Sequence, residues 1–192
     1  MSERTPDLHP DDDQPWTALE RRDVSRAPHI VADLVQGHAG TTFEYTYRPR
    51  GGRAALIVPI TEDGRLVMLR QYRYPIGMTM TEIPAGAVEL GEEPLDAAKR
   101  ELAEEIGGVA RAFEALPLFC PQPSFTGQIF HPFVAFDVTL GENAPEDSEL
   151  LRVEVVPIHE AYRRLDDGEI PNGPSALTLF HARRVLSRRG LL

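Results

Sequence analysis

Three glutamates within a short stretch of the chain could together hold a metal ion. Glu104 and Glu105 follow Glu101 by three and four positions, so a helix would place all three side chains on one side. Carboxylates this close repel one another unless a cation lies between them. Hard divalent cations such as Mg²⁺ or Mn²⁺ prefer oxygen ligands and bridge readily to substrate phosphates. The spacing therefore predicts a divalent metal site that acts on a phosphorylated substrate.

The glutamates lie in the strongest helical pattern of the chain, from Pro94 to Ile106. Proline suits the first turn of a helix, and the pair Gly107-Gly108 would end it. One apolar stripe runs along this segment, formed by Leu95, Ala98, Leu102 and Ile106. We expect the stripe to pack on the core and the glutamates to lie roughly opposite to it, with Arg100 able to pair with Glu104.

The alternative for any glutamate-rich helix is a solvated acidic face, and the flanking residues argue against it here. Gly86 is followed after five residues by Glu92, after seven more by Arg100-Glu101-Leu102, and then by Glu104-Glu105 and Gly107. This spacing resembles the Nudix box, and the chain is similar to the Nudix family from about Gly52 onwards. Gly108 departs from the pattern, because the family usually has an aliphatic residue there; we expect Val109 to take over its packing contact.

The resemblance implies an α+β fold, namely an α/β/α sandwich with a mixed sheet on which the box forms a loop, a helix and a loop. It implies Glu101 and Glu105 as the principal metal ligands, with Glu104 beside them and the carbonyl of Ala85 as a further ligand. Bound Mg²⁺ or Mn²⁺ would neutralise the diphosphate and acidify a water for attack on phosphorus. The residues that would brace the loop and helix are Gly86, Glu92, Arg100 and Gly107.

A carboxylate beyond the box is the candidate for the general base. One branch of the family usually places an acidic residue in a loop ahead of a strand that reads like Leu151 to Val156, and Glu149 matches that position. With Glu104 and Glu105 it completes the predicted catalytic set. The alternative for Glu149 is an ordinary exposed loop glutamate.

Two segments that precede the box or run into its first residue point to the substrate. The runs Leu69 to Pro75 and Glu82 to Gly86, together with Pro123, resemble the ADP-ribose pyrophosphatase branch of the family. By that resemblance the chain would hydrolyse ADP-ribose to AMP and ribose 5-phosphate. The alternatives are another nucleoside diphosphate sugar, such as GDP-mannose, and a non-catalytic domain that senses such ligands.

The candidate substrate-binding residues are Arg73, Glu82 and Phe125. By the same resemblance Arg73 contacts the diphosphate, a role that suits a planar guanidinium; the alternative is a surface arginine at a strand end. Phe125 could stack on the base, or lie in the core as most phenylalanines do. The segment 124–128 lacks the acidic residue that the branch tends to carry there, which leaves the sugar specificity open.

The chain divides into three parts in this interpretation. Residues 1–16 form a disordered or loosely docked tail, residues 17–50 a small antiparallel β subdomain, and residues 51–192 the Nudix domain. Strand-like runs occur at 18–24, 29–35 and 42–47. Three strands are too few to bury a core alone, so we expect them to form a homodimer. The resemblance to the ADP-ribose pyrophosphatase branch implies that they also contribute to the substrate pocket.

Composition limits the partners and the compartment. The formal charge of −10 argues against nucleic acid or an anionic membrane as a partner held by bulk attraction. Cys120 is the only cysteine, which excludes an intrachain disulfide and favours a reducing cytoplasm; we expect it to be a small buried residue. The polar, acidic first residues do not form a signal peptide.

Overall fold

The computed structural model describes residues 17–26, 28–49, 51–141 and 151–192. The chain forms two compact units, of which the first comprises Met1–Gly52 and Leu118–Ile129 and the second Arg53–Pro117 and Phe130–Leu192. Segment 118–129 thus joins the N-terminal strands, whereas the sequence interpretation placed it in the C-terminal domain. None of the helices in the described ranges is long and apolar enough to cross a membrane.

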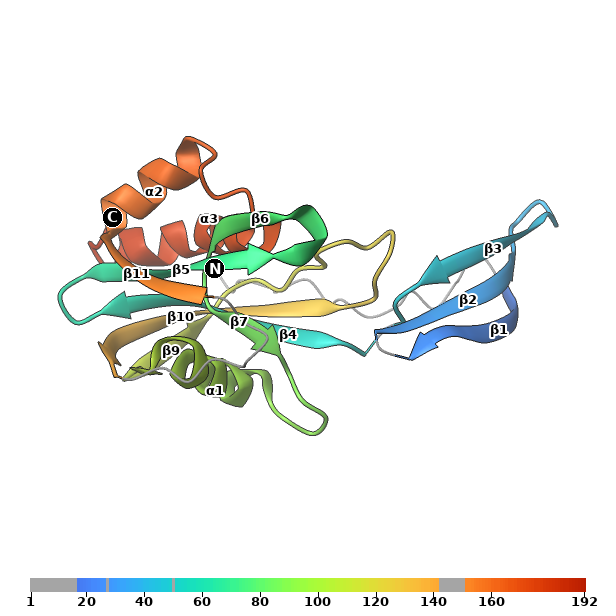
Figure 1. The fold of residues 1–192 in the computed structure, drawn as a ribbon, viewed down its shortest axis with the longest axis horizontal. Helices are drawn as coiled ribbons and strands as arrows, with labels where there is room; N and C mark the ends of the chain where they lie inside the picture. Colours follow the sequence, from blue (N-terminus) through green and yellow to red (C-terminus); the bar gives the residue numbers. More distant parts are fainter. Residues whose placement is uncertain (1–16, 27, 50, 142–150) are drawn as a thin grey trace. The chain divides into compact units, whose positions relative to one another are not determined.

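The first unit contains a three-stranded antiparallel sheet in the order β1-β2-β3 (Figure 1). Its strands are β1 (Thr17–Arg26), β2 (His29–Gln36) and β3 (Thr42–Tyr47). Asp33 is buried in this sheet, where Arg21 donates two hydrogen bonds of 2.7 Å to its carboxylate and the Tyr47 hydroxyl donates one of 2.9 Å. The hydrogen bonds from Arg21 lower the pKa of Asp33. Cys120, in the same unit, is exposed, so its predicted burial is wrong.

The second unit is built on a larger sheet in the order β11-β5-β4-β10-β8. Three short strands extend it: β6 pairs with β5, β7 with β4 and β9 with β10. The strand bounds are β4 (Arg53–Thr61), β5 (Arg65–Arg73), β6 (Met78–Glu82), β7 (Ala85–Ala87), β8 (Gly108–Val109), β9 (Ala112–Ala115), β10 (Ile129–Leu140) and β11 (Leu151–Pro157), and a short 3₁₀ helix, η1, covers Tyr74–Ile76.

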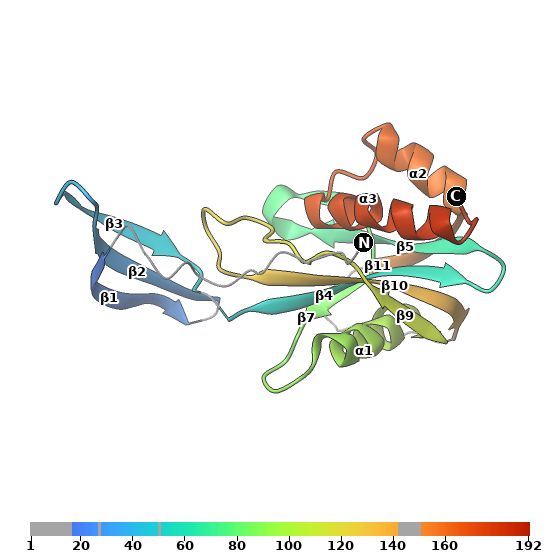
Figure 2. The ribbon, with the colours of Figure 1, turned by 180° about the vertical axis from the view of Figure 1, so that it is seen from behind.

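Helices cover both faces of the larger sheet. Helix α1 (Pro94–Ile106) packs on one face, and α2 (Ile158–Asp166) and α3 (Gly173–Arg188) lie on the other, as the two opposite views agree (Figures 1 and 2). The result is a three-layered α+β unit with a mixed sheet, and a small antiparallel sheet precedes it in the chain. This confirms the predicted fold class.

The core beneath α1 explains why this helix keeps its place on the sheet. Ala98, Leu102 and Ile106 are buried against apolar residues of β4, β5 and β10, as the stripe predicted. Leu95 is 38% exposed, so its predicted place in the core is wrong, and Ala97 is buried in its stead. Two small residues on the buried side of the first turns let the helix lie close to the sheet.

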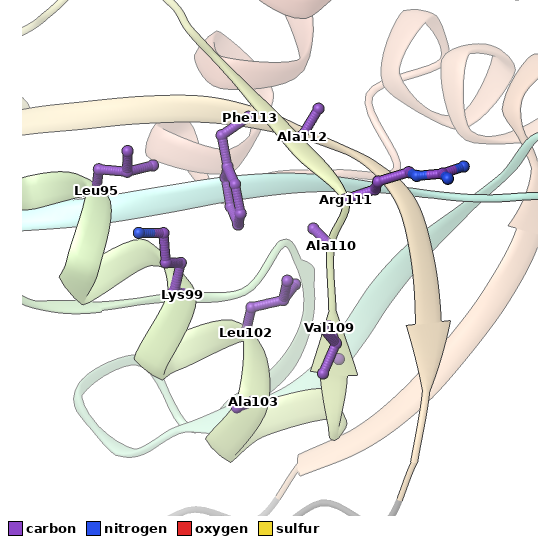
Figure 3. A pocket seen from close by; sticks show the side chains of 10 residues that line it. Leu95, Lys99, Leu102, Ala103, Val109, Ala110, Arg111, Ala112 and Phe113 are labelled. Atoms are coloured by element: carbon purple, nitrogen blue, oxygen red, sulfur yellow. The ribbon is translucent and has the colours of Figure 1, made fainter.

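A groove lies beside α1, and Gly108 is one of the residues that line it. A cavity of about 380 Å³ lies between the helix and residues 108–113, with Leu95, Lys99 and Leu102 on the helix side (Figure 3). A side chain on Gly108 would meet Leu102 Cγ at 2.9 Å, so the helix itself fills the space next to this glycine. Val109 is 68% exposed and does not take over the contact, so that prediction is wrong.

Candidate active site

The loop–helix segment 85–107 presents the predicted metal ligands along α1. Gly107 ends the helix with φ of 62°, a left-handed conformation that glycine adopts without strain, and its N–H donates to the carbonyl of Ala103. At the other end Pro94 occupies the first turn, where its missing N–H leaves no hydrogen bond unmade. The helix bounds are therefore those that the sequence predicted.

Gly86 gives room to the carboxylate of Glu101. A Cβ on this residue would lie 2.0 Å from Glu101 Oε1 and equally close to its carboxyl carbon. No side chain can share that space, so the carboxylate of Glu101 lies directly against the backbone of β7. The glycine of the box is explained by this close approach, because its backbone lies in a strand rather than in a left-handed turn.

Arg100 organises the carboxylates around it. Its Nε and Nη2 each lie 3.1 Å from the carboxylate of Glu92, and its Nη1 donates to Glu101 Oε1 at 2.7 Å and to Glu104 Oε2 at 3.0 Å. Its Nη2 also donates to the carbonyl of Ala87 at 2.8 Å. The hydrogen bonds with Glu92, and after them those with Glu101, raise the pKa of Arg100, which stays protonated. Reciprocally, the hydrogen bond from Arg100 lowers the pKa of Glu92.

Glu105 is the most enclosed of the three helix glutamates, with only 2% of the residue exposed. Its Oε2 accepts a hydrogen bond of 2.9 Å from the N–H of Ala85, which ties the end of α1 to the start of β7. Glu105 therefore does not lie opposite the buried stripe, as the helical pattern predicted, but at its edge. Its position beside β7 brings it to the same strand that receives Glu101.

The donor set fits a hard divalent cation in chemistry, although its oxygens are engaged within the protein. Glu101 and Glu105 approach neighbouring residues of β7, and Glu104 joins them through Arg100. Within the described ranges no three His, Cys, Asp or Glu side chains gather closely enough to hold a metal ion. Arg100 supplies the positive charge between Glu101 and Glu104 in this arrangement. The metal-ligand assignment, including the carbonyl of Ala85, stays a prediction.

The predicted substrate residues Arg73 and Glu82 bind each other. The guanidinium of Arg73 donates from Nε at 2.9 Å and from Nη2 at 2.6 Å to the carboxylate of Glu82. The Glu82 side chain is 3% exposed and that of Arg73 is 42% exposed. The pair spans the adjacent strands β5 and β6, whose register places Glu82 opposite Leu69. A half-exposed guanidinium fixed by a buried carboxylate is suited to bind an anion from its exposed side.

The two remaining predicted residues lie elsewhere. Phe125 belongs to the first compact unit and is exposed; its backbone carbonyl accepts a hydrogen bond of 2.8 Å from the N–H of Arg48. Its exposure contradicts a place in the core. Glu149, the predicted base, lies outside the described residues.

Two residues that the sequence did not single out hold the site from outside the box. Arg53, at the start of β4, donates from Nη2 to the carbonyl of Glu92 at 2.8 Å. Ser175, buried at the start of α3, accepts a hydrogen bond of 3.2 Å from the N–H of Ile83. Both contacts join segments that are distant in sequence, so no local pattern could have revealed them.

Comparison with known proteins agrees with this architecture. The sequence matches the family model described as NUDIX domain over residues 50–176. It is 32% identical over 128 residues to an ADP-ribose pyrophosphatase of Bacillus subtilis (strain 168), covering 66% of this chain and 69% of that protein. It is 33% identical over 158 residues to an ADP-ribose pyrophosphatase of Mycobacterium tuberculosis (strain ATCC 25618 / H37Rv), covering 79% and 70%.

A solved structure shares the fold. The structure titled "Crystal structure of ADP compounds hydrolase" superimposes with a TM-score of 0.82 at 25% sequence identity, covering 93% of this chain and 98% of that one. The likeness extends over nearly the whole of both chains.

Proposed function

This chain belongs to the Nudix family of pyrophosphohydrolases, and we propose that it hydrolyses ADP-ribose to AMP and ribose 5-phosphate. One observation carries the proposal: the carboxylates of Glu101 and Glu105 reach the same short strand from a helix that Arg100 braces. The relatives named above supply the substrate class, because two of them are ADP-ribose pyrophosphatases and the solved structure is an ADP compounds hydrolase.

The predicted residues would have two roles in the reaction, metal binding and substrate binding. Glu101, Glu104 and Glu105, with the carbonyl of Ala85, would hold a divalent metal, for which we propose Mg²⁺ or Mn²⁺. When bound, such a metal neutralises diphosphate charge and acidifies a water molecule. Arg73, oriented by Glu82, would bind a diphosphate oxygen from its exposed side.

Glu149 remains our proposal for the base that deprotonates the attacking water, on its place in the sequence alone. Glu149→Gln should lower kcat and leave Mn²⁺ affinity unchanged, since the residue is not proposed as a metal ligand. An unchanged kcat would reject the assignment.

The direct test of the function is AMP release from ADP-ribose with Mg²⁺, for the wild type beside Glu105→Gln. Glutamine can still accept the hydrogen bond from the N–H of Ala85, so the substitution removes charge and largely keeps shape. We expect kcat to fall by roughly 10²-fold or more, since outer-sphere partners of a metal alone cost 10- to 100-fold. Glu62→Gln is the matched control, because Glu62 is an exposed glutamate in the turn between β4 and β5.

Three outcomes would change the proposal in different ways. An inactive wild type would reject ADP-ribose and direct the assay to other ADP-linked compounds and to GDP-mannose. Binding of ADP-ribose without turnover would indicate a ligand sensor. Equal activity of wild type and Glu105→Gln would reject the metal site.

We also propose that the three-stranded sheet forms a homodimer. Four apolar side chains of this sheet are exposed: Leu19, Val24, Leu34 and Phe43. A second copy of the chain would cover them, and a sheet of three strands gains stability from such a cover. Light scattering at assay concentration tests this, and a monomeric mass would reject it. Since cytoplasmic nucleotide sugars are the proposed substrates, a cytoplasmic location belongs to the same proposal.

A further inference from the structure

The loop that leads from β7 into α1 is attached at both ends to one residue outside the box. The N–H of Val88 donates to the backbone carbonyl of Arg53 at 3.0 Å, and Nη2 of Arg53 donates to the carbonyl of Glu92 at 2.8 Å. The backbone of Arg53 thus fixes the first residue of the loop and its side chain fixes the fifth. The side-chain bond is charge-assisted, so it is stronger than an ordinary amide hydrogen bond.

Glu92, which Arg53 holds by the backbone, in turn holds the helix by its carboxylate. Its Oε2 accepts from the N–H of Glu89 at 2.9 Å, and both of its oxygens bind Arg100 at 3.1 Å. The geometry of this ion pair depends on where the backbone of Glu92 lies. The side chain of Arg53, which belongs to another strand, donates to that backbone and so fixes its position.

Arg100 then sets the positions of two proposed metal ligands. Its Nη1 binds Glu101 at 2.7 Å and Glu104 at 3.0 Å. A continuous series of hydrogen bonds therefore leads from Arg53 through Glu92 and Arg100 to the carboxylates of Glu101 and Glu104. The charge of Arg53 also acts on Glu92 through space, in the same direction as that of Arg100.

We propose that Arg53 is a positioning residue for the metal site, which acts through Glu92 and Arg100 to hold Glu101 and Glu104 where a divalent cation can bind them. This inference rests on the metal site of the proposed function, but not on ADP-ribose being the substrate. Since two residues, Glu92 and Arg100, separate Arg53 from the carboxylates, we place its effect at the lower end of the range for outer-sphere partners of a metal, about 10-fold in metal affinity.

The experiment measures Mn²⁺ binding without substrate, by the electron paramagnetic resonance signal of the free ion. Arg53→Met removes the donor and keeps an apolar stem, and Arg53→Lys restores a cationic donor. Arg65→Met is the matched control, because Arg65 also begins a strand, β5, but pairs with Asp63 in the turn at the opposite end of β4. Thermal unfolding of each variant reports whether the fold is kept.

We expect Arg53→Met to raise the Kd for Mn²⁺ about 10-fold and Arg65→Met to leave it unchanged, with Arg53→Lys in between. Glu92→Gln should raise it as well, and adding Arg53→Met to Glu92→Gln should have little further effect, because the two residues act in series. With ADP-ribose, Arg53→Met should lower kcat and change KM less than twofold.

Wild-type Mn²⁺ affinity in Arg53→Met would overturn the proposal, whatever its activity. Additive effects of Arg53→Met and Glu92→Gln would also overturn it, since they would show that Arg53 acts by another route. If Arg53→Met does not fold, the Kd values of Arg53→Lys and Glu92→Gln for Mn²⁺ decide: wild-type affinity in both would overturn the proposal. Failure of the wild type to hydrolyse ADP-ribose would reject the proposed substrate and leave this test valid.

Discussion

Replacing Gly86 by alanine puts a methyl group where the structure has the carboxylate of Glu101. The new Cβ would lie 2.0 Å from Glu101 Oε1, whereas ordinary van der Waals contact begins at 3.4 Å, so the carboxylate must retreat by about 1.4 Å. Such a movement also breaks the 2.7 Å hydrogen bond with Arg100. The substitution therefore displaces one proposed metal ligand and leaves every side chain of the site chemically intact.

The size of the effect follows from the size of the displacement. A misplacement of about 1 Å in a catalytic group costs on the order of 10²-fold in rate, or about 2.7 kcal/mol of transition-state stabilisation. Overpacking a closed site by one methyl group costs roughly 1–3 kcal/mol of folding free energy. For a chain of this length that corresponds to a fall in Tm of roughly 2–12 °C, so the variant should remain folded at 25 °C.

The assay compares kcat for AMP release with Mg²⁺ at 25 °C and Tm by circular dichroism. Gly173→Ala is the control, because the Cβ that it would add at the start of α3 meets no atom within 4 Å beyond its chain neighbours and its own helix backbone. We expect Gly86→Ala to lose about 10²-fold in kcat and Gly173→Ala to match the wild type. A kcat for Gly86→Ala within threefold of wild type, in a folded protein, would refute the assigned place of the Glu101 carboxylate.

Two further predictions concern the surroundings of the site. Glu82→Ala removes the carboxylate that orients Arg73, so KM for ADP-ribose should rise about 10-fold. Tm should also fall, because the half-exposed ion pair contributes roughly 1 kcal/mol to the free energy of unfolding. An unchanged KM in steady-state kinetics would argue against Arg73 as a diphosphate ligand. Burial and, after it, the charge of Arg53 lower the pKa of His131, whose Nε2 is among the buried atoms without a hydrogen-bond partner in the described chain. Below the ordinary pKa of about 6.5 the unfolded state therefore binds more protons than the folded state. The free energy of unfolding consequently decreases as the pH is lowered. We expect urea unfolding at pH 7.5 and pH 5 to show that the free energy of unfolding decreases less for His131→Phe than for the wild type. Equal decreases would contradict the neutral state of His131.

Prediction from sequence succeeded where the pattern is local. The bounds of α1 follow from Pro94 and Gly107, and the strands of the first sheet were placed to within about two residues. It missed β6 and β7, because both strands are short. They are strands because they pair with β5 and β4. It also misjudged Leu95, since a helical stripe does not show how far the sheet extends beneath the first turn.

The burial of single residues shows the same division. Cys120 and Val109 were assigned to packed positions by residue type, and both are exposed. Residue type gives an average tendency, whereas exposure depends on which segments cover a residue, and that is a property of the assembled chain.

The sequence by itself determined the bounds of α1 and the family, and it predicted the kind of chemistry: the spacing of Glu101, Glu104 and Glu105, with Gly86, Glu92 and Arg100, is that of a helix proposed to bind metal. Tertiary structure alone decided how these side chains are held. The approach of Glu101 to Gly86, the hydrogen bond from Ala85 to Glu105 and the pairing of Arg73 with Glu82 join separate elements. The physical reason is that hydrogen bonds and van der Waals contacts act over a few ångströms of space, and only the folded chain brings these residues that close.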